Sequence, residues 1–190
     1  MRYKLSAPTT LHTTIQLPAS KSISTRALIL HALAQGHIAP SNLSDCDDTR
    51  VMIKALDGIP GHIDLLAAGT AMRFLSANLS VTPGTRFITG TVRMQQRPIR
   101  ILVDALRELG AQIEYAGKEG FPPLRITGTE LTGEEISLAG NVSSQYISAL
   151  LMIGPILKNG LRLNLTGEII TRPYIDLPLE LMKGFDTDAA

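Results

Sequence analysis

The chain has 190 residues, of which 44% are apolar, so it is long and hydrophobic enough to bury a substantial core. Its 18 basic and 17 acidic residues leave a formal net charge of +1, which argues against a generally basic nucleic-acid-binding surface. The single cysteine, Cys46, excludes an intramolecular disulfide framework and fits a reducing compartment. Because no apolar run approaches a signal peptide or the ~20 residues of a membrane span, we expect a cytoplasmic protein.

A short polar cluster followed by a helix-like segment occurs three times along the chain. After each cluster, apolar residues follow the i, i+3, i+4, i+7 spacing of a helix packed on one face. The clusters are Ser20–Ser22, Gly69–Thr70 and Ser143–Gln145. A second helical pattern follows each time, over residues 51–56, 101–109 and 177–182. This order predicts an internal repeat.

Counting between equivalent positions supports the repeat. Lys21 to Ala55 spans 34 positions, Thr70 to Ala105 spans 35, and Ser144 to Leu179 spans 35. The links between units differ, with 15 positions from Ala55 to Thr70 and 39 from Ala105 to Ser144. The longer link has strand-like alternation at 111–116, 124–128 and 135–140, whereas the shorter has it only at 61–66. We therefore expect the first unit to lack about one hairpin. Further strands are predicted at 13–17, 85–90 and 161–167.

The polar clusters stand where helix N-termini would bind an anion. Unpaired N–H groups and a partial positive charge collect at such ends. Ser22 and Arg26 lie one helical turn apart, as do Thr70 and Arg73, while the third cluster supplies two hydroxyls and an amide. For any one cluster, simple N-capping is the more economical interpretation. Three clusters at equivalent points, two of them with an arginine on the same face, favour anion binding.

Two arginine-rich segments add to this pattern. Arg97 precedes a proline suited to the start of a helix, and Arg172 stands in TRPYID. Guanidinium groups offer a fixed fork of donors that matches carboxylate and phosphate. We expect Arg93 and Arg100 to be solvated surface groups.

Two other kinds of site are excluded by the sequence. The four histidines, His12, His31, His37 and His62, lack metal-ligand spacing, and no phosphate-binding loop precedes Lys21.

Five segments resemble, in order, the motif series of 5-enolpyruvylshikimate-3-phosphate (EPSP) synthases, from about residue 13 to 183. They are LPASKSISTRALIL, AAGTAMRF, RMQQRPIRILVDALRELGAQI, NVSSQYISALLM and TRPYID. The resemblance implies an α/β fold with two domains of three βαβαββ repeats each. Residues 1–190 would form one inside-out α/β barrel-like domain that binds substrate, with the first repeat shortened by about one hairpin. Residues 1–13 are expected to cross toward the second domain.

The activity implied by the resemblance is transfer of the enolpyruvyl group of phosphoenolpyruvate to the 5-hydroxyl of shikimate 3-phosphate, with no metal or organic cofactor. Shikimate 3-phosphate would be held by Ser22, Arg26, Ser143, Ser144, Thr171 and Tyr174. The phosphoenolpyruvate side would comprise Lys21, Gly69, Arg97 and Gln145, with Thr70 and Arg73 shaping the pocket. Lys21 and Arg97 would act in catalysis by electrostatics. Phe74 stands where the family usually has proline, which predicts an altered pocket helix and altered glyphosate sensitivity.

The acid–base carboxylates of the family are expected in a second domain. The third unit also lacks the strand that would follow ELMKGF, so we expect a longer protein, monomeric at full length, of which this chain is the N-terminal portion. Alone, the chain is expected to bind small-molecule substrates without turning them over. The alternative is a free-standing anion-binding module or one half of a split enzyme, which a natural stop codon after Ala190 would favour.

Overall fold

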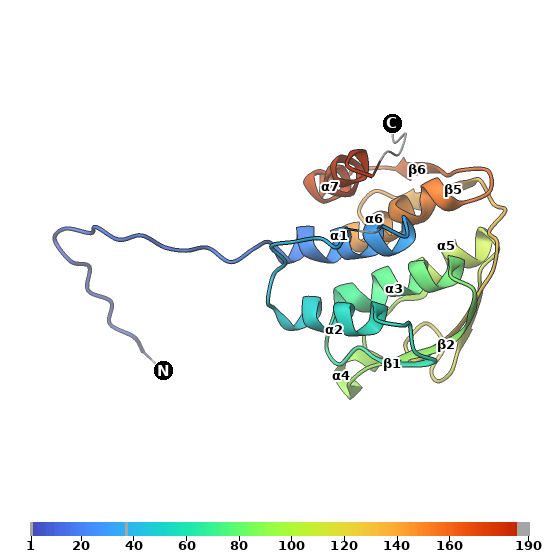
Figure 1. Cartoon of the computed structure of the whole chain (residues 1–190), viewed down its shortest axis with the longest axis horizontal. Coiled ribbons are helices and arrows are strands. Elements are labelled where there is room, and N and C mark those ends of the chain that lie inside the picture. The colour runs from blue at the N-terminus through green and yellow to red at the C-terminus, as the bar shows by residue number, and fades with distance from the viewer. Residues whose placement is uncertain (1, 37, 186–190) are drawn as a thin grey trace.

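The computed structural model describes residues 2–36 and 38–185 and has a mixed α/β architecture (Figure 1). Its helices are α1 (Lys21–Leu33), α2 (Asp47–Leu56), α3 (Gly69–Val81), α4 (Val92–Gln95), α5 (Arg100–Glu108), α6 (Ser144–Ile153), the 3-10 helix η1 (Gly154–Ile156) and α7 (Arg172–Lys183). Its strands are β1 (His62–Asp64), β2 (Gly84–Thr89), β3 (Gln112–Tyr115), β4 (Leu124–Gly128), β5 (Glu135–Ala139) and β6 (Arg162–Thr166).

Helix α3 forms the centre of the core. Every residue from Gly69 to Ser80 is buried, because α1, α2, α5, α6 and the strands β2 and β4 all pack against this helix. Figure 1 shows α1, α3 and α6 lying alongside one another. The buried hydroxyls of Ser76 and Ser80 donate to the carbonyl oxygens four residues earlier. Neither hydroxyl is therefore an unpaired donor in the core.

Two sheets cover this helical core. The four-stranded sheet has the order β1-β2-β4-β3, in which β1 is parallel to β2 and the other pairs are antiparallel. Its register sets Ile63 beside Ile88 and Ile88 beside Leu124, and all three side chains are buried. Strands β5 and β6 form a separate parallel pair. Alternate residues of β1, β3 and β4 are buried, as a period-two pattern predicts.

Most of the expected strands are confirmed. Those predicted at 61–66, 85–90, 111–116, 124–128, 135–140 and 161–167 correspond to β1, β2, β3, β4, β5 and β6. The strand expected at 13–17 is wrong. Residues 2–20 form an extended segment that runs away from the body (Figure 1), and Leu17 is 84% exposed. A strand needs a hydrogen-bonded neighbour, and no described segment lies beside this one.

The segment that follows the first helix pair, α1 and α2, lacks a hairpin that follows α3 and α5, as the sequence spacing predicts. Residues 57–61 join α2 directly to β1, whereas the hairpin β3–β4 follows α5. The barrel-like arrangement of three repeats stays a prediction, and the strand expected after Phe185 lies outside the described residues. Of the helices in the described ranges, none combines the length and apolarity needed to cross a lipid bilayer.

Candidate functional site

The three polar clusters all lie at helix N-termini, as expected. Ser20 caps α1, where its Oγ accepts a hydrogen bond from Ile23 N at 3.4 Å. Ser143 caps α6, where its Oγ accepts from Gln145 N at 3.4 Å. Helix α3 begins at Gly69 without a side-chain cap, because its N-cap residue is alanine. N-capping therefore explains the presence of Ser20 and Ser143. The N–H groups in the first turn of α3 have no side-chain cap and are available to an anion.

Side chains near the helix N-termini join α1, α3, α6 and α7. Gln145 Nε2 on α6 donates to Thr70 Oγ1 on α3 at 3.3 Å. One turn further along α6, Ser148 Oγ donates to the carbonyl oxygen of Tyr174 on α7 at 3.0 Å. Gln145 and Thr70 both lie in the first turn of their helices, and Arg26 of α1 contacts Ser148, each in a second turn. Helices α1, α3 and α6 therefore run parallel, with their N-termini at one end. Their dipoles consequently act together there.

Arg26 is the buried centre of this end. Only 2% of its surface is exposed, and its guanidinium donates to Ser22 O at 3.0 Å and to Ser148 Oγ at 2.8 Å. The guanidinium carbon also lies 5.0 Å from the centroid of the Phe74 ring, a cation–π distance. Burial lowers the pKa of Arg26 to about 10, and its Nε has no partner among the described residues. Phe74 thus provides the surface on which this cation rests.

A second pair of guanidinium groups lies at the start of α3. Arg73 Nη1 donates to Gly69 O at 2.7 Å, and Arg73 lies over the Tyr146 ring at 5.4 Å. Arg97 reaches the same glycine from its loop, because a Cβ at Gly69 would lie 2.7 Å from Arg97 Cζ and 2.9 Å from Arg73 Nη1. The pKa of Arg73 is lowered chiefly by burial and further by the charge of Arg97, against an opposing effect of Tyr146.

The loop that carries Arg97 is held in place by α6. Tyr146 Oη donates to the carbonyl oxygen of Pro98 at 2.8 Å. Arg97 and Arg93 both line an adjoining pocket of about 410 Å³. Arg93, expected as a solvated surface group, is exposed and also faces this pocket. Arg100 is the solvated group that we expected, since it pairs with Glu119 at 2.8 Å on the surface.

Lys21, at the start of α1, faces a carboxylate that the sequence did not single out. Its Nζ lies 3.6 Å from Asp48 Oδ1, in the first turn of α2. The Asp48 side chain is 22% exposed, so it is a partly sheltered partner for an exposed amine. Cys46 is half-buried at the N-cap of α2, with Sγ 3.3 Å from Thr49 Oγ1.

Several hydroxyls at this end have no partner within the described ranges. Ser22 and Ser144 form no side-chain hydrogen bond there, and the Thr171 Oγ1 atom is buried and unpaired at the start of α7. Tyr174 accepts hydrogen bonds through its backbone carbonyl, whereas the residue is 49% exposed. The described residues include no group of three His, Cys, Asp or Glu that could hold a metal ion, and His37 lies outside them.

The structure therefore brings together most residues that the sequence proposed and adds three that it missed. The additions are Asp48, Tyr146 and Ser148. Ser148 follows Ser144 at i+4 on α6, so helical spacing from the cluster would have found it. Asp48 contacts Lys21 and Tyr146 contacts Pro98, and each pair is far apart in the sequence. No local sequence pattern predicts such contacts.

The chain is similar to known proteins over nearly its whole length. The family model described as EPSP synthase (3-phosphoshikimate 1-carboxyvinyltransferase) matches residues 5–64 and 58–189. A 3-phosphoshikimate 1-carboxyvinyltransferase of Bacteroides fragilis is 73% identical over 190 residues, which is all of this chain and 46% of that protein. One of Shewanella halifaxensis is 43% identical, covering 92% of this chain and 47% of the relative. The chain thus spans about half the length of these curated relatives.

A solved structure agrees with the fold. An EPSP synthase of Acinetobacter baumannii superimposes with a TM-score of 0.72 at 24% sequence identity, over 85% of this chain and 42% of that one. At this identity the likeness concerns the fold alone. It supports the mixed α/β class that was expected from the sequence.

Proposed function

Because the chain belongs to the EPSP synthase family, we propose that it binds shikimate 3-phosphate and part of phosphoenolpyruvate as the N-terminal portion of a 3-phosphoshikimate 1-carboxyvinyltransferase. The observation that carries the proposal is the gathering of Arg26, Arg73 and Arg97 around the aligned helix N-termini. None of the three forms an ion pair within the described residues. Cations that lack counter-ions beside helix N-termini favour an anionic ligand.

The hydroxyl-bearing part of this end is assigned to shikimate 3-phosphate. Ser22, Ser144 and Thr171 offer hydroxyls without partners, and a phosphate or a polyhydroxylated ring can accept their hydrogen bonds. Ser143 presents backbone groups at the start of α6, and the exposed side of Tyr174 offers an aromatic surface to the ring. Arg26 acts from beneath, as a buried positive charge.

The part around α3 is assigned to phosphoenolpyruvate. Gly69 and Thr70 provide the close backbone approach, Gln145 bridges the two helices, and Arg97 supplies an exposed charge. Lys21 and Arg97 would stabilise charge as it builds on the reacting phosphate and carboxylate. Asp48 holds Lys21 in position without contacting the ligand.

The rest of the proposal concerns the whole protein. Residues 1–190 form one substrate-binding domain, and a second portion supplies the acid–base groups that complete the transfer to the 5-hydroxyl. The 46% coverage of the Bacteroides fragilis relative supports this division. We place the reaction in the cytoplasm, where a single cysteine such as Cys46 stays reduced.

Binding of shikimate 3-phosphate by the purified chain tests the proposal. We expect saturable binding that weakens with added salt, since exposed charges are screened by ions. Ser144→Ala should lower the affinity about tenfold or more, because a hydrogen bond to a charged group contributes about 1.5–3 kcal/mol. Titration calorimetry or ligand-detected NMR measures both effects. Arg100→Gln, which changes a surface arginine paired with Glu119, is the matched control and should bind like the wild type.

Two results would contradict this assignment. Equal affinity of Ser144→Ala and the wild type would remove the start of α6 from the site. Failure of the wild-type chain to bind at millimolar shikimate 3-phosphate would mean that this portion holds no independent substrate site.

Catalysis is expected to be absent from the chain alone. Mixed with shikimate 3-phosphate and phosphoenolpyruvate, it should release no phosphate, because the proposal puts the general acid and base in the second portion. The full-length Bacteroides fragilis relative provides the positive control in the same colorimetric assay. Turnover by the 190-residue chain, purified from a host lacking its own enzyme, would show that the acid–base groups are among the residues described above.

A further inference from the structure

The backbone is strained at Leu66, in the loop that joins β1 to α3. Its φ angle is 51°, in the left-handed region that residues with a Cβ atom rarely adopt. The Leu66 side chain is 51% exposed, so its burial does not account for this conformation. The next residue, Ala67, lines the pocket that Arg93 and Arg97 share. Other contacts must therefore hold the turn, immediately ahead of the proposed anion site.

Asp64 holds this turn from its N-terminal side. Its Oδ1 atom accepts a hydrogen bond from Leu66 N at 2.9 Å. A carboxylate that bonds the backbone two residues further along takes the place of one part of a backbone turn. Asp64 forms no ion pair with another described residue. Acceptance of this hydrogen bond is therefore its structural contribution.

The carbonyl group of Leu66 joins the turn to the segment that begins α4, which lies beside this loop (Figure 1). Leu66 O accepts from Thr91 N at 2.9 Å and from Thr91 Oγ1 at 3.4 Å. Gly90 permits this approach, because a Cβ at Gly90 would lie 2.5 Å from Leu66 O. Gln95 Nε2 in turn donates to Gly90 O at 2.9 Å. The turn and the start of α4 are thus fixed to each other.

This junction determines where Arg97 lies. Thr91 is the N-cap of α4, where its Oγ1 accepts from Met94 N at 3.4 Å, and Arg97 N donates to Met94 O at 3.0 Å. This short stretch connects Leu66 to the arginine whose guanidinium reaches Gly69. Because Leu66 also leads directly into α3, the turn positions both the start of that helix and the guanidinium opposite it.

We propose that Asp64 is a positioning residue for the anion site, because it keeps Leu66 in the left-handed turn that aligns Arg97 with the start of α3. The inference rests on the proposed function, in which the phosphate of phosphoenolpyruvate binds there. The role depends on the hydrogen bond that Asp64 accepts, since its negative charge by itself opposes the binding of an anion. Without that hydrogen bond, Leu66 leaves the left-handed region and Arg97 loses its place over Gly69.

Two variants that change the charge equally test this role, with inorganic phosphate as the probe. Asp64→Asn keeps an oxygen that accepts from Leu66 N, so its phosphate affinity should equal or exceed that of the wild type. Asp64→Ala removes the acceptor as well and should lower the affinity at least threefold. NMR follows the backbone amides of Gly69 and Thr70 in each titration, and urea unfolding checks that every variant folds.

The double variant Asp64→Ala/Leu66→Gly provides a rescue. Glycine adopts the left-handed conformation without support, so phosphate affinity should return to within twofold of that of the wild type. Amide hydrogen exchange at Thr91 reports the junction without a ligand. This exchange should be faster in Asp64→Ala than in the wild type, in Asp64→Asn and in the double variant.

Leu66→Val is a further variant should Asp64→Ala fail to fold, and it should also lower phosphate affinity at least threefold, because β-branched residues are especially disfavoured at positive φ. Equal affinities of Asp64→Ala and Asp64→Asn, with normal binding by the wild type, would overturn the positioning role alone. Absence of phosphate binding at Gly69 in the wild type would contradict the proposed function and this role together.

Discussion

Gly69→Ala is expected to lower the affinity of the chain for inorganic phosphate at least tenfold without unfolding it. The added methyl group would overlap the Arg97 guanidinium, with Cζ at 2.7 Å, and would crowd Arg73 Nη1 at 2.9 Å. Both obstacles are the ends of flexible side chains, so the arginines move while the backbone stays. Loss of one charge-assisted contact to phosphate amounts to about 1.5–3 kcal/mol, or about 10- to 100-fold.

NMR titration with phosphate measures this affinity, and urea unfolding checks the fold. Gly61→Ala is the matched control, because a Cβ at Gly61 meets nothing within 4 Å. Unchanged phosphate affinity in Gly69→Ala would show that Arg97 does not need its position over the glycine. A cooperative loss of structure would show that the arginines cannot move aside.

Replacement of Arg26 by methionine is expected to stabilise the fold by about 1–2 kcal/mol while weakening shikimate 3-phosphate binding at least tenfold. Burial lowers the pKa of Arg26 to about 10, which means that the folded structure disfavours the charged form. Methionine removes the buried charge, keeps contact with Phe74 and loses the hydrogen bonds to Ser22 and Ser148.

The pH dependence follows from the same pKa. Because burial lowers this pKa, the unfolded chain holds the Arg26 proton more tightly than the folded chain does at alkaline pH. Above about pH 10, the free energy of unfolding of the wild type is therefore expected to rise with pH relative to that of Arg26→Met. Urea unfolding at pH 7 and pH 10.5 should show the advantage of the variant shrinking.

Arg107→Met is the control for this measurement, since Arg107 is an exposed arginine that stacks on Tyr115 at 4.9 Å. It should not gain stability, because no buried charge is removed. Destabilisation of Arg26→Met by more than about 1 kcal/mol at pH 7 would mean that the contacts of Arg26 outweigh its burial.

The features predictable from the sequence are local ones. Helix starts were found at Ser20, Gly69 and Ser143 because small and polar residues precede an apolar period, a pattern that lies within a few residues. Strands β3 and β4 were found in the same way, from alternation between turn signals. The spacing of the helix pairs also predicted the direct link between α2 and β1.

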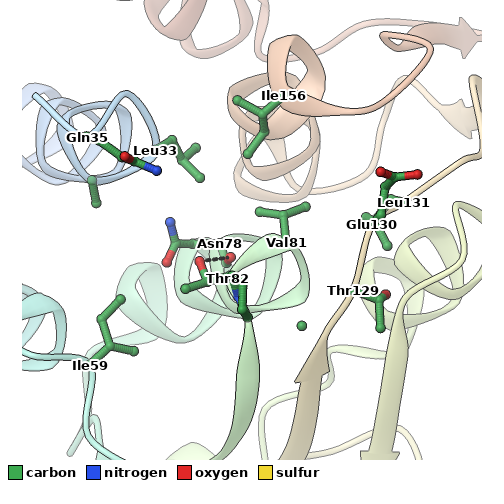
Figure 2. Close-up of a pocket in the computed structure, with 13 residues that line it drawn as sticks. Leu33, Gln35, Ile59, Asn78, Val81, Thr82, Thr129, Glu130, Leu131 and Ile156 are labelled. Atoms are coloured by element: carbon green, nitrogen blue, oxygen red, sulfur yellow. Dashed lines mark hydrogen bonds between the residues drawn. The ribbon is translucent and has the colours of Figure 1, made fainter.

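The features that escaped prediction depend on distant partners. Residues 13–17 alternate like a strand but have no neighbour among the described residues to complete their hydrogen bonds. The contacts of Arg26 with Ser148 and Tyr174 depend on the packing of α6 and α7 against α1, which no local pattern reveals. A hollow lined by Leu33, Asn78 and Ile156 likewise lies between the ends of helices that are separated in sequence (Figure 2).

The complete burial of α3 has a consequence for mutational tolerance. An ordinary surface helix has an outer face on which charged residues, fluorescent labels and sequence drift are accommodated. From Gly69 to Ser80 this helix has no such face, so each of these positions must be filled by a side chain of fitting size. In a saturation-mutagenesis library, this stretch should retain the fewest substitutions of any helix in the chain, and reporter groups belong on α5 or α7 instead.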